Sequence, residues 1–327
     1  MEFNRLRRYR VNETIRNMFA ETRLSVKDVI LPFFVIEGKN KKEPIPSMPG
    51  IYRLSKDLLV REIKDVKKYG INTFLLFGIP GKKDGTGTGA YSKNGIIRET
   101  ALEIKEKVED VVIITDVCLC GYTTHGHCGI VKKEKDGQFY IDNDETIKIL
   151  AEIAVSHAES GVDFVAPSAM MDGQVKKIRE SLDGNGFYNT RIMGYSAKYA
   201  SGFYGPFRDA LDSSPQFGDR KTYQMDYRNL EQAMKEIEED IKEGADIIMV
   251  KPALSYLDVI KTASEKYKFP LAAYNVSGEY GMIKSACRQG LFKEKDVVLE
   301  ILTSIKRAGA DFIITYFARE AAKWLQD

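Results

Sequence analysis

The segment Gly244-Ala-Asp-Ile-Ile-Met-Val250 decides the fold, because close variants of it occur three more times along the chain. The other copies are Gly70-Ile-Asn-Thr-Phe-Leu-Leu-Phe77, Gly161-Val-Asp-Phe-Val-Ala166 and Gly309-Ala-Asp-Phe-Ile-Ile-Thr315. Each copy follows an amphipathic helical stretch. The glycine suits the left-handed position just past a helix end, and the apolar run suits a strand that is buried on both faces. The repeat therefore predicts four junctions from a helix into a parallel strand.

Four further apolar runs complete the pattern, namely Leu31-Pro-Phe-Phe-Val35, Val111-Val-Ile-Ile-Thr115, Arg191-Ile-Met-Gly-Tyr195 and Pro270-Leu-Ala-Ala-Tyr274. Eight strands separated mostly by helical pattern, at about 40 residues per unit, favour a (β/α)₈ TIM barrel. A doubly wound open sheet is the alternative. Residues 30–327 would form this α/β catalytic barrel, and residues 1–29 an extended N-terminal arm that serves oligomerisation.

Composition narrows the classes of protein to consider. The 327 residues are 43% hydrophobic and carry 49 basic and 47 acidic side chains, a net charge of +2, which gives no general case for nucleic acid. The basic tract of Arg5, Arg7, Arg8 and Arg10 favours contact with another subunit over contact with RNA. No apolar run reaches about 18 residues, and the N-terminus lacks the apolar region of a signal peptide. We therefore expect a soluble, cytoplasmic protein that does not enter membranes.

Reactive side chains come directly after several of the predicted strands, where a barrel enzyme keeps its chemistry. Two of them are lysines, Lys198 and Lys251, although lysine normally lies on solvated surfaces. An amine held against apolar neighbours or beside a second cation has its pKa lowered toward roughly 7 to 8, which makes it a nucleophile for carbonyl carbon. The sequence therefore indicates imine chemistry at two lysines. The other strand ends supply Asp116, Ser168, Asp172, Ser277 and Tyr316.

Three of the four cysteines, Cys118, Cys120 and Cys128, lie within eleven residues and form a candidate metal site. Residues two apart on a strand point to the same side, so Cys118 and Cys120 can share an ion while a glycine-containing loop brings Cys128 back. Three thiolates suit zinc. The spacing matches none of the common iron–sulfur patterns, and three buried cysteines without metal are the plainer alternative.

The coordination number of this candidate site is left open by the sequence. His125 or His127 could supply a fourth ligand and make the site structural, whereas three ligands plus water leave a position for substrate. Clustered thiols also indicate a reducing compartment, not a disulfide scaffold.

The stretch from Ser201 to Asp226 is predicted to be an active-site lid, because so long a connection inside a compact domain usually closes over a site. The guanidinium group of arginine can make two parallel hydrogen bonds to a carboxylate, so two arginines in a lid imply a small acidic substrate. Either arginine alone could be a solvated surface residue. The substrate-binding candidates in this lid are Phe207, Arg208, Arg220 and Gln224.

These motifs together resemble the porphobilinogen synthase family, also called 5-aminolevulinate dehydratase, over nearly the whole chain. Besides the cysteine segment, the resemblance rests on Tyr195-Ser-Ala-Lys198-Tyr-Ala-Ser201, Phe203-Tyr-Gly-Pro-Phe-Arg208-Asp-Ala210, Met249-Val-Lys251-Pro252 and Asn275-Val-Ser277-Gly-Glu279. It implies condensation of two 5-aminolevulinate molecules in tetrapyrrole biosynthesis, on the (β/α)₈ fold that the strand count favours.

The resemblance also implies roles for the two halves of the site. Lys251 would form an imine with the molecule that becomes the propionate side of the product, and Ser277 and Tyr316 would hold its carboxylate. Lys198 would bind the second molecule, whose carboxylate is clamped by Arg208 and Arg220, with Gln224 nearby. Zinc on the three cysteines would engage the second molecule, with Asp116 in support. Family members without this zinc have Ala and Asp in place of the cysteines, so the chain resembles the zinc type.

Two further expectations come from the family. Its members commonly form a homo-octamer in which N-terminal arms wrap neighbouring subunits, and the Arg5 to Arg10 arm resembles that element. Some members carry an allosteric magnesium ion, and the position that corresponds to their glutamate is Glu236. A solvated helix face explains the acidic run around Glu236 equally well.

Three other functions stay open on the sequence alone. A class I aldolase-like lyase would also use a barrel lysine, but it needs only one. A non-catalytic zinc-binding scaffold would explain the cysteines and leave both lysines dispensable. An inactive homologue is disfavoured, because no identified motif position is substituted.

Overall fold

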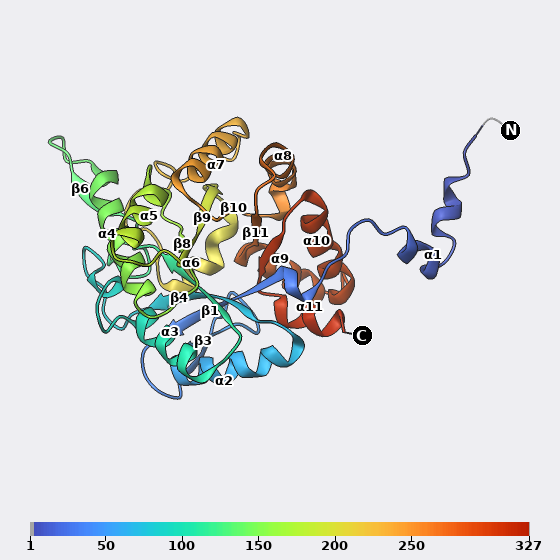
Figure 1. Ribbon diagram of the computed structural model, residues 1–327, viewed down its shortest axis with the longest axis horizontal. Helices are drawn as coiled ribbons and strands as arrows, with labels where there is room; N and C mark the ends of the chain where they lie inside the picture. The colour runs from blue at the N-terminus through green and yellow to red at the C-terminus, as the bar shows by residue number, and fades with distance from the viewer. Residues whose placement is uncertain (1–2, 327) are drawn as a thin grey trace.

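The computed structural model describes residues 3–326, so the first two residues of the predicted arm and residue 327 lie outside the described range (Figure 1). Eight parallel strands form a closed barrel, because the last strand also pairs with the first. This closure confirms the predicted (β/α)₈ barrel and excludes an open doubly wound sheet. The barrel strands are β1 (Val29–Ile36), β4 (Thr73–Ile79), β5 (Val112–Val117), β8 (Phe164–Pro167), β9 (Arg191–Lys198), β10 (Ile247–Lys251), β11 (Leu271–Asn275) and β12 (Phe312–Thr315).

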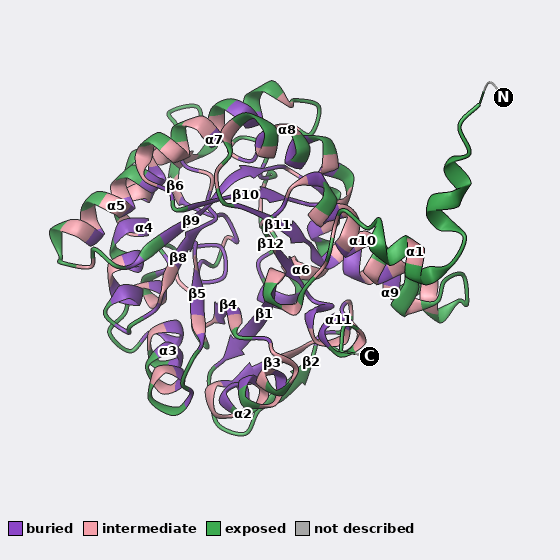
Figure 2. Cartoon of the chain, turned by 45° about the vertical axis from the view of Figure 1, so that its right-hand side comes forward, coloured by how far each residue is buried: buried purple, intermediate pink, exposed green. Residues whose placement is uncertain are grey.

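Helices surround this barrel and bury its strands, as the ring of helices with exposed outer faces in Figure 2 shows. Their apolar faces pack on the strands and their charged faces meet solvent, as expected of amphipathic helices. These helices are α2 (Lys56–Val66), α3 (Ile96–Lys107), α4 (Asn143–Ala158), α5 (Gln174–Gly184), α7 (Glu231–Glu243), α8 (Leu257–Tyr267), α9 (Ser277–Arg288), α10 (Glu294–Ala308) and α11 (Ala318–Trp324). None of the helices in residues 3–326 combines the length and apolar character needed to cross a bilayer.

The repeated glycine and aspartate of the fold-deciding segments have separate tasks. Each glycine has a positive φ, for example +101° at Gly244, which ends the preceding helix without steric strain. The segment that starts at Gly70 has Asn72 in this place, and the aspartates of the other three segments each accept a hydrogen bond from a backbone N–H near the start of the neighbouring strand, which fixes the register of the two strands. These bonds join Asp163 to Ile113 (2.7 Å), Asp246 to Ile192 (2.7 Å) and Asp311 to Leu271 (3.0 Å).

Insertions at the strand ends build the rim of the barrel. The short strands β2 (Lys42–Pro44) and β3 (Tyr52–Ser55) extend the sheet beside β1, and β6 (Ile130–Lys133) and β7 (Phe139–Asp142) form a hairpin after β5. The predicted lid contains a short helix, α6 (Gly205–Leu211), with a proline in its first turn. It ends at Asp212, whose φ of +48° places the residue in the left-handed region.

The N-terminal segment leaves the barrel as an extended arm with the helix α1 (Glu13–Met18) and a 3₁₀ turn at Leu6–Arg10 (Figure 1). No residue from 3 to 28 is buried. Several of its apolar side chains are largely exposed, including Phe3 (63%), Val11 (69%) and Met18 (74%). Apolar side chains gathered on a projecting arm are typical of a surface that another chain covers.

Candidate active site

Two lysines end neighbouring strands at the carboxyl edge of the barrel. Lys198 is the last residue of β9 and Lys251 the last of β10, and the two are register partners across the sheet. Both are nearly inaccessible, with exposed fractions of 5% and 4%. Lys198 Nζ donates a hydrogen bond to the carbonyl oxygen of Ser168, at the end of β8 (2.5 Å). The structure therefore brings two amines into one desolvated space.

Lys251 lies in an aromatic cage. Its Nζ is 4.2 Å from the ring centroid of Tyr274, 4.8 Å from that of Phe207, 5.0 Å from that of Tyr195 and 5.3 Å from that of Tyr204. Burial, and next the charge of Lys198, lower the pKa of Lys251 to about 7. A sizeable fraction of this amine is therefore neutral near pH 7, as nucleophilic attack on a carbonyl requires.

Tyr195 and Tyr274 of this cage were not singled out in the sequence, although both lie inside predicted strands. Each places a hydroxyl-bearing ring at the end of a short run of apolar residues, and that is the signal that could have identified them. The Tyr195 hydroxyl is buried and has no hydrogen-bond partner among the described residues. The ring centroid of Tyr195 lies 5.4 Å from the Lys198 Nζ and 5.0 Å from the Lys251 Nζ. A buried hydroxyl without a partner is costly, so this hydroxyl near both amines points to a ligand.

Asp116 lies on β5 and faces the same space. Its Oδ1 is buried and has no partner within residues 3–326. Burial raises the pKa of Asp116 to about 6, although the charge of Lys198 acts in the opposite direction. Asp116 can therefore exchange a proton at neutral pH, close to the lysine amines.

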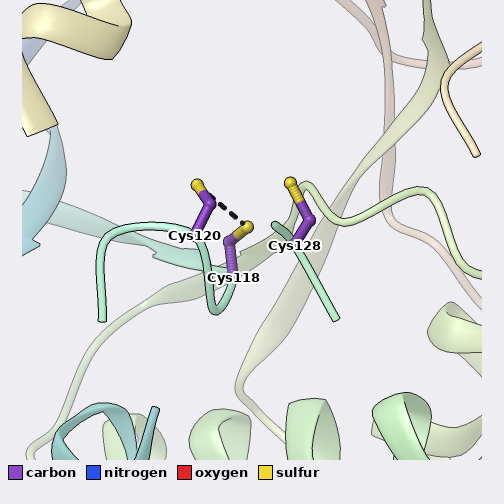
Figure 3. A group of neighbouring side chains, drawn as sticks. All are labelled: Cys118, Cys120 and Cys128. Atoms are coloured by element: carbon purple, nitrogen blue, oxygen red, sulfur yellow. Dashed lines mark hydrogen bonds between the residues drawn. The ribbon is translucent and has the colours of Figure 1, made fainter. Parts of the chain in front are cut away.

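The three clustered cysteines converge on one point, with ligand atoms all within 4.8 Å of one another. Cys118 and Cys120 lie on one turn of the chain, and Cys128 approaches from a separate segment (Figure 3). The sulfurs of Cys118 and Cys120 are 3.5 Å apart, and all three thiols are free and buried. Hydrogen bonds from the Cys118 and Cys120 thiols lower the pKa of Cys128 well below its usual value. The cluster thus favours at least one thiolate, the form that binds metal.

The ring nitrogens of the two neighbouring histidines, His125 and His127, are already within hydrogen-bond distance of other groups. His127 places Nδ1 3.1 Å from the Tyr223 hydroxyl and Nε2 2.9 Å from the Phe217 carbonyl oxygen. His125 accepts the backbone N–H of His127 at Nδ1 (3.1 Å) and places Nε2 3.2 Å from the Gly85 carbonyl oxygen. Every ring nitrogen therefore has a partner, and the group with ligand geometry consists of the three cysteines alone within the described part of the chain.

The polar residues of the lid approach the site with unsatisfied groups. Gln224 is 3% exposed, and neither its amide nitrogen nor its amide oxygen has a partner in the described chain. The Nε atoms of Arg208 and Arg220 are also buried without partners there. Arg220 is held in place by hydrogen bonds to the carbonyl oxygens of Gly126 (2.8 Å) and Ser213 (2.7 Å). Buried donors without partners fit a site that awaits a polar, anionic ligand.

Ser277, Tyr316 and Phe207 gather on the Lys251 side. Ser277 Oγ accepts the backbone N–H of Phe207 (3.0 Å), which links the start of α9 to α6 in the lid. The Tyr316 hydroxyl lies 3.1 Å from that of Tyr274, whose ring faces the Lys251 amine. Hydroxyl groups from two strand ends thus lie next to the caged amine.

Glu236 lies apart from the lysines, on helix α7. It lines a cavity of about 760 Å³ together with Asp172, Gln224 and Asp240, and neither lysine is among the residues that line it. Burial raises the pKa of Glu236, and Asp172 and Glu243 act in the same direction. The structure therefore groups Glu236 with other carboxylates in a cavity that neither Lys198 nor Lys251 lines.

Comparisons with known proteins agree on one family. The family model described as delta-aminolevulinic acid dehydratase matches residues 3–324. Proteins of that name from Bacillus subtilis and Archaeoglobus fulgidus are 54% and 55% identical to the chain, each over 99% of both sequences. A crystal structure of delta-aminolevulinic acid dehydratase (porphobilinogen synthase) from Toxoplasma gondii, in complex with the reaction product porphobilinogen, superposes with a TM-score of 0.95 at 46% identity. It covers 98% of this chain and 91% of its own.

Proposed function

This chain belongs to the delta-aminolevulinic acid dehydratase family, and we propose that it joins two 5-aminolevulinate molecules through imines on Lys251 and Lys198. It is a hydro-lyase with porphobilinogen synthase activity, which serves tetrapyrrole (heme) biosynthesis. The observation that carries the proposed mechanism is the pair of buried amines on neighbouring strands, one of which has a pKa of about 7.

The Lys251 half of the site starts the chemistry. Its neutral amine attacks the keto carbon of one substrate molecule, and loss of water gives a protonated imine that acidifies the neighbouring carbon. Ser277 and Tyr316 hold the carboxylate of this molecule with their hydroxyls, which lie beside the aromatic cage. The aromatic rings exclude water, so that the imine is protected from hydrolysis.

The Lys198 half binds the second substrate molecule. Arg208, Arg220 and Gln224 receive its carboxylate, which satisfies the buried polar atoms that lack partners in the described chain. Each imine releases one water as it forms. The carbon–carbon and the carbon–nitrogen bond each form by addition to an imine carbon, and the lysine then leaves that carbon as a free amine in an elimination in which the product loses a proton. Both amines are thereby regenerated, and two waters leave per porphobilinogen.

We assign zinc to Cys118, Cys120 and Cys128. The three sulfurs lie within 4.8 Å of one another, and three converging thiols are a donor set that suits zinc. The ring nitrogens of His125 and His127 have other partners, so the three cysteines alone would hold the ion. When bound, zinc would supply Lewis acidity to the second substrate molecule. Asp116 exchanges a proton nearby.

Two further parts of the proposal lie outside the active site. Glu236 lines a cavity with Asp172 and Asp240, and carboxylate oxygens are ligands that magnesium prefers, so Glu236 is the residue that would contribute to a regulatory magnesium ion. Within residues 3–326 no three of these carboxylates lie close enough together to form a ligand set by themselves. The exposed apolar side chains of the N-terminal arm, with the basic tract of Arg5, Arg7, Arg8 and Arg10, fit a homo-octamer in which arms cover neighbouring subunits. A cytoplasmic location completes the proposal.

An isotope-mixing assay tests the proposed condensation. Purified zinc-loaded protein is given equal amounts of unlabelled and fully ¹³C-labelled 5-aminolevulinate, and the product is analysed by mass spectrometry. We expect porphobilinogen molecules that carry one labelled and one unlabelled half. Folded, zinc-loaded protein that yields no porphobilinogen would refute the proposed function.

A further inference from the structure

Glu279 is the centre of a buried hydrogen-bond network behind the Lys251 half of the site. It lies in the first turn of α9 and is 0% exposed. Its Oε1 accepts the backbone N–H of Leu254 (2.8 Å), and its Oε2 accepts the Asn275 side-chain amide (2.8 Å) and the Val276 backbone N–H (2.9 Å). One carboxylate thus takes three donors from two different strand ends.

The network continues to a third strand end. The Thr315 hydroxyl donates a hydrogen bond to Asn275 Oδ1 (2.9 Å). The same Thr315 oxygen accepts a hydrogen bond from the backbone N–H of Phe317 (3.1 Å). Asn275 and Thr315 are both 0% exposed. The chain of bonds therefore runs from the segment after β10, through the end of β11, to the end of β12.

Each of these contacts lies beside a residue assigned to the same substrate molecule. Leu254 follows Lys251 by three residues, Val276 precedes Ser277, and Thr315 precedes Tyr316. We propose that Glu279 is a positioning residue, which holds Lys251, Ser277 and Tyr316 in register around one 5-aminolevulinate molecule. This inference rests on the function proposed above.

A purely local role does not account for these contacts. As the third residue of α9, Glu279 also caps the helix by accepting the N–H of Val276, and a cap needs only that bond. The bond to Leu254 crosses to another strand end and serves no helix terminus of α9. Within residues 3–326 no hydrogen bond links Glu279 to Lys198, Arg220 or Gln224, so its hydrogen bonds are confined to the Lys251 half.

Two substitutions of Glu279 distinguish its proposed positioning role from the effects of its charge and of its helix cap. Glu279→Gln keeps the shape, but its NH₂ group must face either the Leu254 or the Val276 N–H, so one strand end loses its acceptor. Glu279→Asp keeps the charge and can still cap α9, but it is one methylene too short to reach Leu254 as well. Glu294→Gln is the matched control, because Glu294, at the start of α10, pairs with Lys284 of α9 and makes no hydrogen bond to the three strand ends within residues 3–326.

The experiment is reductive trapping of 5-aminolevulinate with cyanoborohydride, followed by peptide mapping of adducts on Lys251 and on Lys198. In both Glu279 variants we expect the rate of adduct formation on Lys251 to fall at least about tenfold, since small misplacements of reacting groups cost that much or more. The rate on Lys198 stays within about twofold of wild type, as do both rates in Glu294→Gln. Melting temperatures are recorded, and trapping is done well below them.

The outcomes are distinguishable. Wild-type protein without an adduct on either lysine would refute the proposed imine mechanism itself. Wild-type trapping on Lys251 with an equal rate in both Glu279 variants would refute only the positioning role. An equal loss at both lysines, in step with melting temperature, would make Glu279 a general structural residue and overturn the inference in the same way.

Discussion

Lys198 and Lys251 are register partners on the adjacent parallel strands β9 and β10, so their side chains leave the sheet on the same side. Two ammonium groups in one desolvated space repel each other, and the pair is most stable when one of them is neutral. The barrel thus places two amines together at its carboxyl edge and favours a neutral, nucleophilic form of one of them, as attack on the first keto acid requires.

Replacing Lys251 by methionine should abolish turnover without harming the fold. The loss should be at least about 10³-fold, as is usual when a covalent nucleophile is removed. The aromatic cage accepts an apolar side chain more readily than a buried amine, so the melting temperature should not fall. Porphobilinogen formation and calorimetry measure both effects, with Lys261→Met on the exposed face of α8 as the control. Retained activity in Lys251→Met would refute the proposed imine mechanism.

Removing the charge of Lys198 should change how the rate of adduct formation on Lys251 depends on pH. The pKa of Lys251 is lowered to about 7, so the reactive neutral amine and the rate of adduct formation increase as the pH rises through that value. Burial is the main cause and remains in Lys198→Met, but the repulsion is lost, so the midpoint should move to higher pH by about one unit. Cyanoborohydride trapping on Lys251 across pH 5 to about 9 measures it. An unmoved midpoint would mean that the two amines do not interact.

Zinc content should follow the cysteine cluster and not the histidines. Cys120→Ser should reduce bound zinc and activity together, because only two thiolates remain. His125→Gln should keep its zinc, since the ring nitrogens of His125 already have protein partners. Metal analysis after dialysis against a weak chelator measures both, with Cys287→Ser, remote from the cluster, as the control. Loss of zinc in His125→Gln would place a histidine among the ligands.

The two lid arginines should respond differently to substitution. Arg208→Ala should raise KM about tenfold to a hundredfold with little change in melting temperature, because its buried Nε has no partner in the described chain and waits for a charged ligand. Arg220→Ala should also destabilise the protein by roughly 1–3 kcal/mol, since it removes hydrogen bonds to Gly126 and Ser213. Steady-state kinetics and thermal melts of the pair decide this. A large fall in melting temperature for Arg208→Ala would contradict a binding role.

The aspartate of the repeated segment should prove important for stability. Asp246→Ala removes the acceptor of the Ile192 N–H near the start of β9, which should cost about 1–3 kcal/mol of unfolding free energy. Denaturant unfolding measures this cost, and Asp258→Ala, on the first turn of α8, is a comparison without such a bond to a strand. Equal stability of the Asp246 variant and wild type would show that the repeated aspartate does not hold the strands.

The sequence was sufficient for the barrel because its information is local. The glycine of each of the four repeated segments ends a helix, and these segments with four further apolar runs give eight strands buried on both faces. Eight such strands favour a barrel over an open sheet, and the pairing of β12 with β1 decides between the two. Lys198 and Lys251 could be assigned to the site for the same reason, since both come at the end of an apolar run. The helix α6 inside the lid was not predicted, because seven residues of mixed character carry too little periodicity.

Other features of the site depend on contacts between segments that are far apart in the sequence, and such contacts cannot be predicted from the local pattern of one sequence. The ring nitrogens of His127 have their hydrogen-bond partners on Phe217 and Tyr223, about ninety residues further along the chain. The aromatic cage depends on which face of its strand each tyrosine occupies. The Glu279 network connects three strand ends that become neighbours only when the barrel closes.

The most direct test of the central claim is to trap the wild-type protein with 5-aminolevulinate and borohydride and to locate the adduct by peptide mass mapping. Imine chemistry on the paired lysines predicts a reduced adduct on Lys251, with a second on Lys198, and no adduct on Lys251 in the Lys251→Met variant. Folded, zinc-loaded protein that forms porphobilinogen but carries no adduct on either lysine would contradict the account.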